Sequence, residues 1–441
     1  MKKDSSNKLT LIGSISLGTG VMIGAGIFAL MGQVAELAGN LFPIAFLVGG
    51  IVTGLSAYSY VKFSNAYPSS GGVAKFLGKA YGPGTITGTF SLLMYVSMVI
   101  AESLVARTFG SYTLRLFNVG DDSALVPILG VVLIAAAFII NISGNKIIGA
   151  SATITAIAKI LGIALLAIAG LAASGFPSFE NLGTAESSDW SLMGGFIAAL
   201  ALSILAYKGF TTITNQGDDI VNPNKNVGRS IIFSVLICMV IYVSLALSVS
   251  ANLSIPDIIE AKNYSLAEAS QPVFGNMGLW FTVILAIIAT VSGLIASVFS
   301  ASRLLAMLSR MKQIPALRFK FSNPSLLLTV SLAIILTILF DLTRIAAIGA
   351  IFYIVMDIAV HWGLFRFLRK EVSFNPLVPL LALLFDTVIL IAFIILKFNS
   401  DPLVLVVSFA GILIVIVAER LFMKTHTDSN GKMNMEMDMK D

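Results

Sequence analysis

Six charged side chains lie inside long apolar stretches of this sequence: Glu102, Arg107, Lys159, Lys208, Asp357 and Asp386. A charge in the middle of a membrane-spanning helix costs on the order of 2.5–3.5 kcal/mol on insertion, so each one requires a partner or a function. Lys159 is the one charge in the otherwise apolar run from Ser151 to Ala173. A lysine removed from water can release and regain a proton. The alternative is an ammonium permanently paired with a carboxylate as a structural link.

The other buried charges leave similar alternatives open. Glu102 is a candidate proton relay or a partner for a lysine, and its alternative is a local pair with Arg107, five residues away. Asp357 and His361 lie four residues apart, so one helix face carries both. They form either a second protonatable pair or a link to neighbouring helices. For Asp386 we expect a packing or dimer contact.

The composition places these charges in a polytopic membrane protein. The 441 residues are 57% hydrophobic and 12% charged, with a mean hydropathy of +0.93, and no soluble domain buries that much apolar surface. A single cysteine and two histidines argue against a disulfide, a cysteine metal cluster and a haem or histidine-rich metal site. We expect no cofactor, no metal and no nucleic-acid partner. The sequence has no hydrolase motif, and its "GAGIFA" opens no soluble dinucleotide-binding unit, so no enzyme is predicted.

Twelve runs are long and apolar enough to be spanning helices: 10–32, 41–63, 84–114, 124–144, 148–171, 190–216, 230–251, 272–303, 323–341, 344–367, 376–397 and 402–422. They are too long and too uniformly apolar for barrel strands. With the N-terminus inside, the outer side receives only four cations: Arg115, Lys262, Arg344 and Lys397. This bias predicts cytoplasmic ends at 1–9 and 423–441, the latter as a disordered tail.

Glycines interrupt two of the runs at mid-depth. Gly24 and Gly26 lie in the first run, and Gly209 lies in the sixth, five helices later. Such a pair is typical of an inverted-repeat transporter whose site lies at two helix breaks. An unwound helix offers free N–H groups to a carboxylate and free carbonyls to an ammonium, which suits an amino acid zwitterion. The alternative is that the glycines only let helices pack closely.

Four stretches resemble the amino acid–polyamine–organocation (APC) superfamily, and the chain is similar to its proton-coupled, broad-specificity amino acid transporter branch. They are "GTGVMIGAGIF", "YPSSGG", "AYKGFTTITNQGDDIVNPNKNVGRSI" and "SASRLLAMLSR". The resemblance implies an all-α, leucine-transporter-like core of two inverted five-helix repeats, here 10–172 and 190–368. Two extra helices would occupy 376–422.

The resemblance also implies a substrate site. The α-carboxylate and α-amino groups would be bound through the backbone of Ile23, Gly24, Ala25 and Gly26, facing a wall of Ala206, Tyr207, Gly209 and Phe210. "YPSSGG" would be an inner loop near the cytoplasmic gate. Asp218, Asp219 and Asn222–Pro223 match the acidic stretch and the Asn-Pro pair that follow the sixth helix in the superfamily.

Lys159 would occupy the place where sodium-coupled relatives hold their ion. Its ammonium would lie between carbonyls of the first helix and the hydroxyls of Thr290 and Ser292 in the eighth, and Glu102 would border the substrate cavity. Lys208 departs from the pattern, because many relatives carry a glutamate or an apolar residue there. It could attract a second substrate carboxylate, pair with Glu102, or lie in water.

We therefore expect a proton-coupled amino acid symporter of the plasma or inner membrane that works by alternating access. The alternatives are an exchanger of amino acids or polyamines and, less favoured, a channel or a non-transporting nutrient sensor on the same scaffold. The expected partners are an amino acid, protons and the lipid bilayer. We expect a monomer or a homodimer.

Overall fold

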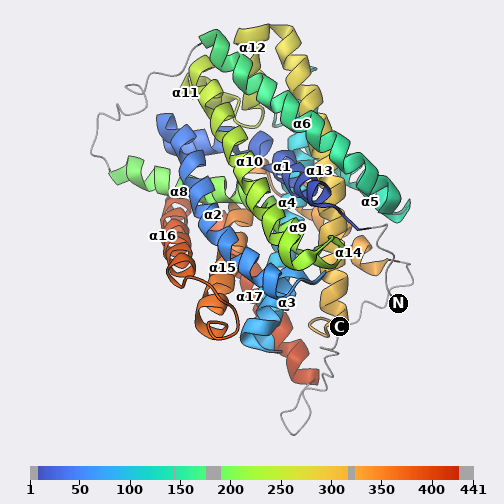
Figure 1. Ribbon diagram of the computed structural model, residues 1–441. Coiled ribbons are helices and arrows are strands. Elements are labelled where there is room, and N and C mark those ends of the chain that lie inside the picture. The colour runs from blue at the N-terminus through green and yellow to red at the C-terminus, as the bar shows by residue number, and fades with distance from the viewer. Residues whose placement is uncertain (1–7, 144, 175–189, 316–322, 427–441) are drawn as a thin grey trace.

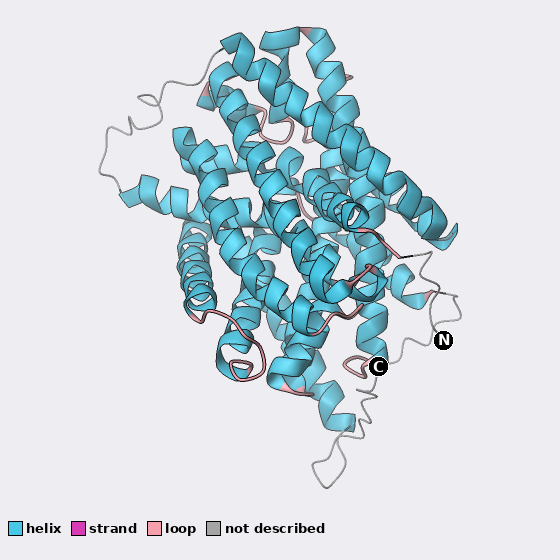
Figure 2. Cartoon of the chain, in the orientation of Figure 1, coloured by secondary structure: helices cyan, strands magenta, loops and turns pink. Residues whose placement is uncertain are grey.

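The computed structural model describes residues 8–143, 145–174, 190–315 and 323–426, and these residues are almost entirely helical (Figure 2). Within these ranges the only β feature is an isolated bridge between Leu9 and Ile220. By length and composition, ten segments of the described residues qualify as membrane spans, the first being Gly26–Ala66. Two shorter apolar stretches, Leu11–Gly24 at the start of the first long helix and Pro324–Leu339, stand beside them. The predicted all-α membrane fold of about twelve helices is confirmed.

The long helices follow the predicted runs closely. They are α1 (Leu11–Ala38), α2 (Phe42–Ala66), α4 (Thr85–Arg115), α5 (Leu125–Ser143), α6 (Asn145–Ser174), α8 (Trp190–Tyr207), α10 (Pro223–Asn252), α13 (Asn276–Arg310), α14 (Pro324–Leu339), α15 (Leu342–Phe367), α16 (Leu377–Ser400) and α17 (Pro402–His426). The short ones are η2 (Gly39–Leu41), α3 (Gly72–Tyr81), η3 (Lys208–Phe210), α9 (Thr211–Thr214), η4 (Gly217–Asp219), α11 (Ile255–Glu260) and α12 (Ser265–Phe274). α17 extends past its predicted end at 422.

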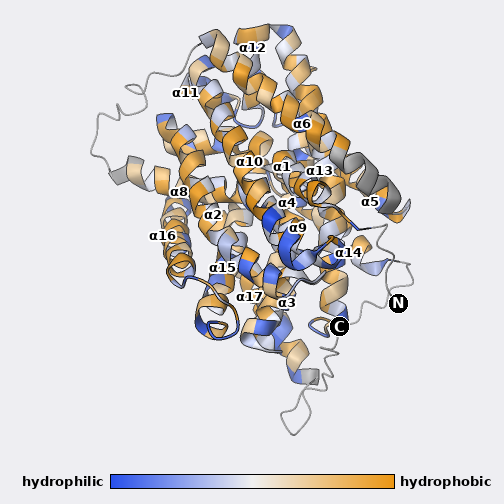
Figure 3. Ribbon diagram, viewed as in Figure 1, coloured by the Kyte–Doolittle hydropathy of each residue, from blue (hydrophilic) through white to orange (hydrophobic). Residues whose placement is uncertain are grey.

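The outer helices present apolar side chains to the surroundings, as lipid requires. On α6 the exposed residues recur at helical spacing: Ile154, Ile157, Leu161, Leu165 and Ile168. The opposite face, with Lys159 and Ile163, is buried. Figure 3 shows the same apolar colour over α6 and α16, whereas polar residues gather around α9.

α1 runs through the middle of the bundle. It packs against α8, α10, α13 and α6, while α15 packs against α4 and α16 (Figure 1). α16 lies on α15, α8 and α2, and α17 lies on α4 and α15. Movement of α1 therefore affects several helices at once.

The predicted unwinding of the first helix is wrong, because α1 is a continuous α-helix from Leu11 to Ala38. Its glycines serve close packing instead. A Cβ at Gly24 would lie 2.8 Å from the Ala289 carbonyl oxygen on α13, and one at Gly26 would collide with the Ala206 carbonyl oxygen on α8. The sixth helix does change at Gly209, where α8 gives way to the 3₁₀ turn η3.

Candidate functional site

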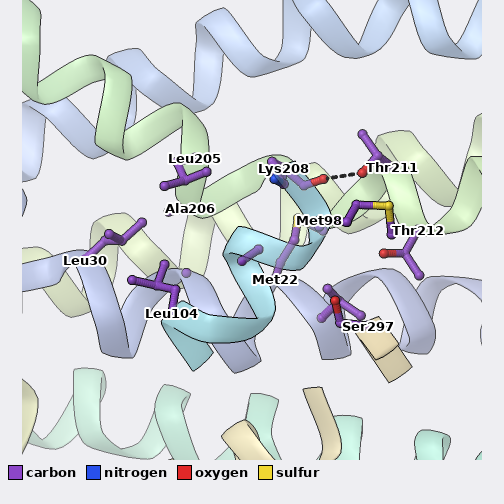
Figure 4. A pocket seen from close by; sticks show the side chains of 14 residues that line it. Met22, Leu30, Met98, Leu104, Leu205, Ala206, Lys208, Thr211, Thr212 and Ser297 are labelled. Atoms are coloured by element: carbon purple, nitrogen blue, oxygen red, sulfur yellow. Dashed lines mark hydrogen bonds between the residues drawn. The ribbon is translucent and has the colours of Figure 1, made fainter. Parts of the chain in front are cut away.

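A small buried cavity lies between α1, α4, α13 and the segment formed by α8, η3 and α9 (Figure 4). Its volume is about 30 Å³, and its lining comprises Val21, Met22, Gly26, Leu30, Met98, Ala101, Leu104, Leu205, Ala206, Lys208, Gly209, Thr211, Thr212 and Ser297. Three of the predicted substrate-binding residues, Gly26, Ala206 and Gly209, belong to this lining. The predicted selectivity residue Lys208 does too.

The other predicted substrate-binding residues are not part of this lining. Ile23 is fully buried outside the cavity lining, and Gly24 contacts α13. The Tyr207 hydroxyl donates to the Phe46 carbonyl on α2 at 3.0 Å. The Phe210 ring packs edge-on against Tyr60, with centroids 5.1 Å apart. The side chain of Ala25 lies outside the described residues.

Ten lining residues were missed by sequence reasoning. On α4 they are Met98, Ala101 and Leu104, whose spacing of three places them on one helix face. That spacing was readable in the sequence, but it does not reveal which face of α4 meets α1. Most of the missed residues are apolar, so the walls away from η3 suit an apolar side chain.

Lys208 turns its charge toward α4. Its ammonium donates to the carbonyl oxygen of Ser97 at 2.6 Å and to the hydroxyl of Ser97 at 2.5 Å, and it lies 5.4 Å from the centre of the Tyr353 ring. Because only 5% of the residue is exposed, the water-exposed alternative is wrong.

Glu102 is fully buried on α4, and neither of its carboxylate oxygens accepts a hydrogen bond from the described residues. The alternative of a pair with Arg107 is wrong, because the Arg107 Nε donates to the Thr337 carbonyl at 2.8 Å. Lys208 acts on Glu102 through its longer-range field, since the Lys208 ammonium is bonded to Ser97. Within the described residues Glu102 is thus a buried acid without an ion-pair partner, and the side chain of Ser297 on α13 adjoins it.

Lys159 is held between three helices. Its ammonium donates to the Gly20 carbonyl of α1 at 2.8 Å and to the Ser292 hydroxyl of α13 at 2.9 Å, and the residue is 1% exposed. The other predicted partner, Thr290, donates instead to Ala286 on its own helix at 2.7 Å. No carboxylate in the described part of the chain pairs with Lys159, which contradicts the structural-link alternative.

A second cavity of about 370 Å³ adjoins the Lys159 ammonium. It is lined by Ser16, Leu17, Gly20, Thr155, Lys159, Ile287, Ile288, Val291, Ser292, Ile295 and Ala296. Ser16 precedes Gly20 on α1, Thr155 precedes Lys159 on α6, and Ile295 follows Ser292 on the antiparallel α13. From Lys159 the cavity therefore extends toward the end of the bundle that contains the start of α1.

Polar contacts join three of the four motif stretches at that same end. The backbone N–H of Ser70 in "YPSSGG" donates to Asp218 at 2.7 Å. Arg303 of α13 donates to Asp219 at 2.6 Å. Asn222, with a left-handed φ of 50°, turns the chain into α10. These contacts connect the segments that follow α2 and α9 to each other and to α13.

Asp386 makes a packing contact between helices, which is one of the two expected alternatives; its burial contradicts the other, a dimer contact on an outer surface. It is fully buried on α16, with one carboxylate oxygen 3.3 Å from Nε2 of His361 on α15. The sequence left the two alternatives open because it does not show that α16 docks this face against α15.

Comparison with known proteins gives a consistent family. The family described as "Amino acid permease" matches residues 9–422. An uncharacterised protein of Methanocaldococcus jannaschii is 33% identical over 80% of this chain and 81% of its own length. An inner membrane transport protein of Escherichia coli, YbaT, is 26% identical over 96% of this chain and 98% of its own length. The serine/threonine exchanger SteT of Bacillus subtilis is 25% identical over 92% of this chain and 95% of its own length.

Proposed function

Because this chain belongs to the amino acid permease family, whose members compared above include membrane transporters and not enzymes, we propose that it is a proton-coupled amino acid symporter. The observation that carries the proposal is Lys159. It is a lysine with no carboxylate partner among the described residues, buried where α1, α6 and α13 meet. Such a group at membrane depth is a candidate proton carrier.

The coupling follows from what Lys159 binds. Protonated, it donates to both Gly20 and Ser292 and so ties α1 to α13. Neutral, it has one donor fewer and no charge, and hydrogen bonds to a charged group are the stronger kind. Gly20 lies on the same helix as Met22 and Gly26, which line the first cavity. Proton and substrate therefore both act on the position of α1, which is the requirement for coupling.

We assign the substrate to the 30 Å³ cavity. Gly26, Ala206 and Gly209 would surround the α-carboxylate and α-amino groups of the substrate. Ligand pockets usually measure about 300–1,000 Å³, so this conformation is closed and must widen to admit an amino acid. The apolar walls favour neutral amino acids with apolar side chains. Lys208 is engaged by Ser97, which argues against a free cation that would select acidic substrates.

Uptake into proteoliposomes tests the proposal. Purified protein should accumulate neutral amino acids under an imposed inward proton gradient and stop when a protonophore collapses it. A sodium gradient alone should give no accumulation. Accumulation driven by sodium and indifferent to protons would refute the role of Lys159, and uptake of every small solute at channel-like rates would refute a transporter.

Exchange is the second candidate, since a relative at 25% identity is named a serine/threonine exchanger. Liposomes loaded with unlabelled substrate separate the two. A symporter accumulates label into empty liposomes under a proton gradient, whereas a strict exchanger takes up label only when internal substrate is present.

We further propose that the protein lies in the cell membrane with both termini in the cytoplasm and that its core consists of repeats 10–172 and 190–368. Arg115, Lys262, Arg344 and Lys397 are the cations assigned to the outer side, and this small number supports the orientation. Reporter fusions at the two ends should be active only in their cytoplasmic form. A monomer and a homodimer differ in mass by light scattering in detergent.

A further inference from the structure

Three titratable side chains form a buried cluster that the proposed cycle does not use. Asp357 and His361 come from α15 and Asp386 from α16, all fully buried, and one ligand-type atom from each lies within 4.8 Å of the other two. The His361 Nε2 is 3.3 Å from an oxygen of Asp386 and 3.5 Å from one of Asp357.

The two carboxylates of the cluster have different surroundings. The oxygens of Asp357 accept hydrogen bonds from the Tyr60 and Ser56 hydroxyls of α2, both at 2.6 Å. No hydroxyl or backbone N–H among the described residues donates to Asp386, whose polar neighbour is the Nε2 of His361 at 3.3 Å. A buried carboxylate with so few donors is unfavourable in its ionised form. Asp386 is therefore the member that an added proton would neutralise.

The total charge of the cluster also favours a proton on Asp386. With both carboxylates ionised and His361 neutral, the cluster carries a charge of −2, and protonation of the imidazole leaves −1. The Nδ1 of His361 is already engaged, 2.9 Å from the hydroxyl of Ser59, so a proton on Nε2 faces the two acids. One more proton on Asp386 makes the cluster neutral, which a fully buried site favours.

Few other titratable groups face this cluster. Asp357 and Asp386 are the charged groups that act on His361 in the described residues, and the tyrosines Tyr60 of α2 and Tyr353 of α15 adjoin them. One cation approaches these tyrosines: the ammonium of Lys208 donates to Ser97 and also lies 5.4 Å from the centre of the Tyr353 ring. Of the groups on other elements packed against α15, Tyr81 of α3 donates to the Ala359 carbonyl, Glu419 of α17 lies beside Gly88, and Glu102 of α4 has no ion-pair partner among the described residues.

Tyr60 connects the cluster to the candidate substrate site. Its hydroxyl donates to Asp357, and its ring packs edge-on against Phe210 with an interplanar angle of 83°. Phe210 belongs to η3, and the two other residues of that turn, Lys208 and Gly209, line the cavity. The Nε2 of His361 lies beside both Asp386 and Asp357. A proton on Asp386 therefore alters the interaction of His361 with Asp357, and this change reaches the turn through Tyr60 and Phe210.

We propose that Asp357, His361 and Asp386 are a second proton-binding site, whose occupancy sets how firmly α2 and α15 hold the turn η3. Proton binding at this site is independent of the proposed function. Its consequence for transport rests on that function and differs from the role of Lys159: the cluster proton governs the rate, whereas the Lys159 proton drives accumulation.

Infrared difference spectroscopy on the purified full-length protein, with isotope-labelled aspartate, tests proton binding directly. Between mildly alkaline and mildly acidic buffer, the wild type should gain a signal of a protonated, water-shielded aspartate that Asp386→Asn lacks. Thr387→Val, which changes the exposed neighbour of Asp386 on the same helix, should keep the signal. If Asp386→Asn does not fold, His361→Gln serves instead and should move the signal to a different pH.

Three results would overturn the proposal. One is an unchanged signal in Asp386→Asn, and another is an unshifted signal in His361→Gln. The third is a stoichiometric divalent metal in the wild-type protein that Asp386→Asn loses, since the cluster would then be a metal site.

In proteoliposomes, the change of the initial uptake rate with pH should be at least threefold smaller in Asp386→Asn than in the wild type. The accumulation ratio per unit of pH gradient should stay the same. An unchanged pH profile in the folded variant would sink the proposed control of η3. If the wild type shows no uptake at all, the proposed function fails, and the infrared result still decides whether the cluster binds a proton.

Discussion

Replacing Lys159 by methionine should separate the energy source of transport from the fold. The substitution keeps an apolar chain of similar length and deletes the ammonium. Two hydrogen bonds are lost, to Gly20 and Ser292, each contributing about 1.5–3 kcal/mol because the donor is charged. Relief of the buried charge offsets this by on the order of 2.5–3.5 kcal/mol. We therefore expect a net destabilisation of about 3.5 kcal/mol or less, and a folded protein.

The effect on accumulation should be far larger. One proton per neutral substrate contributes about 1.4 kcal/mol per pH unit, a factor of about ten. A membrane potential of ~100 mV adds about 2.3 kcal/mol for the charge that moves. Together these give about 3.7 kcal/mol, which limits wild-type accumulation to roughly 500-fold. Lys159→Met has no proton to carry at this position, so its accumulation ratio should fall to about one.

Counterflow is the internal control for this variant, because exchange of labelled for unlabelled substrate needs alternating access but no driving gradient. We expect Lys159→Met to retain counterflow. Thr290→Val is the matched control on α13, since the Thr290 hydroxyl bonds its own helix and not Lys159; it should accumulate normally. Proton-driven accumulation that persists undiminished in Lys159→Met would refute the reasoning and leave the lysine a structural residue.

Three further substitutions test the site and its closure. Lys208→Met removes hydrogen bonds of about 1.5–3 kcal/mol each that tie η3 to α4, so uptake should fall at least tenfold in initial-rate assays while competition still shows a preference for neutral over acidic substrates. Gly26→Ala inserts a methyl group where α1 meets α8 and should cost about 1–3 kcal/mol and most transport, as thermal unfolding and uptake will show. The control Gly54→Ala, with open space around it, should behave as wild type. Arg303→Gln breaks the partly exposed pair with Asp219 and should weaken closure by about 1 kcal/mol or less, seen as counterflow that no longer depends on ionic strength.

The sequence predicted the helices well because a membrane leaves few alternatives. Every spanning helix must satisfy its own backbone and cover about 30 Å of hydrocarbon, so length and apolarity alone locate it. The buried position of Lys159 was also readable. Ile157 and Leu161, two residues before and two residues after Lys159, lie on the opposite face of α6. If those two apolar residues face lipid, helical periodicity places the lysine on the inner face.

Facts that depend on a neighbouring helix were not readable. Glycine permits either unwinding or close contact, and only the backbone of α8 against Gly26 decides for contact. Thr290 and Ser292 differ by about 200° around their helix, so one of them at most can face Lys159, and the sequence does not say which. The partner of Asp386 depends likewise on how α16 docks.

The continuity of α1 strengthens the case for coupling and does not weaken it. Gly20, which binds the Lys159 ammonium, and Gly26, which lines the cavity, lie six residues apart on one unbroken helix, which is about 9 Å. An unwound segment between them would absorb movement, whereas an intact helix passes it on. Under the proposed mechanism α1 shifts when the cavity widens for an amino acid, and a shift of about 1 Å along the 2.8 Å bond to Gly20 would stretch it beyond hydrogen-bond range. We therefore expect substrate occupancy and the binding of the protonated lysine to vary together.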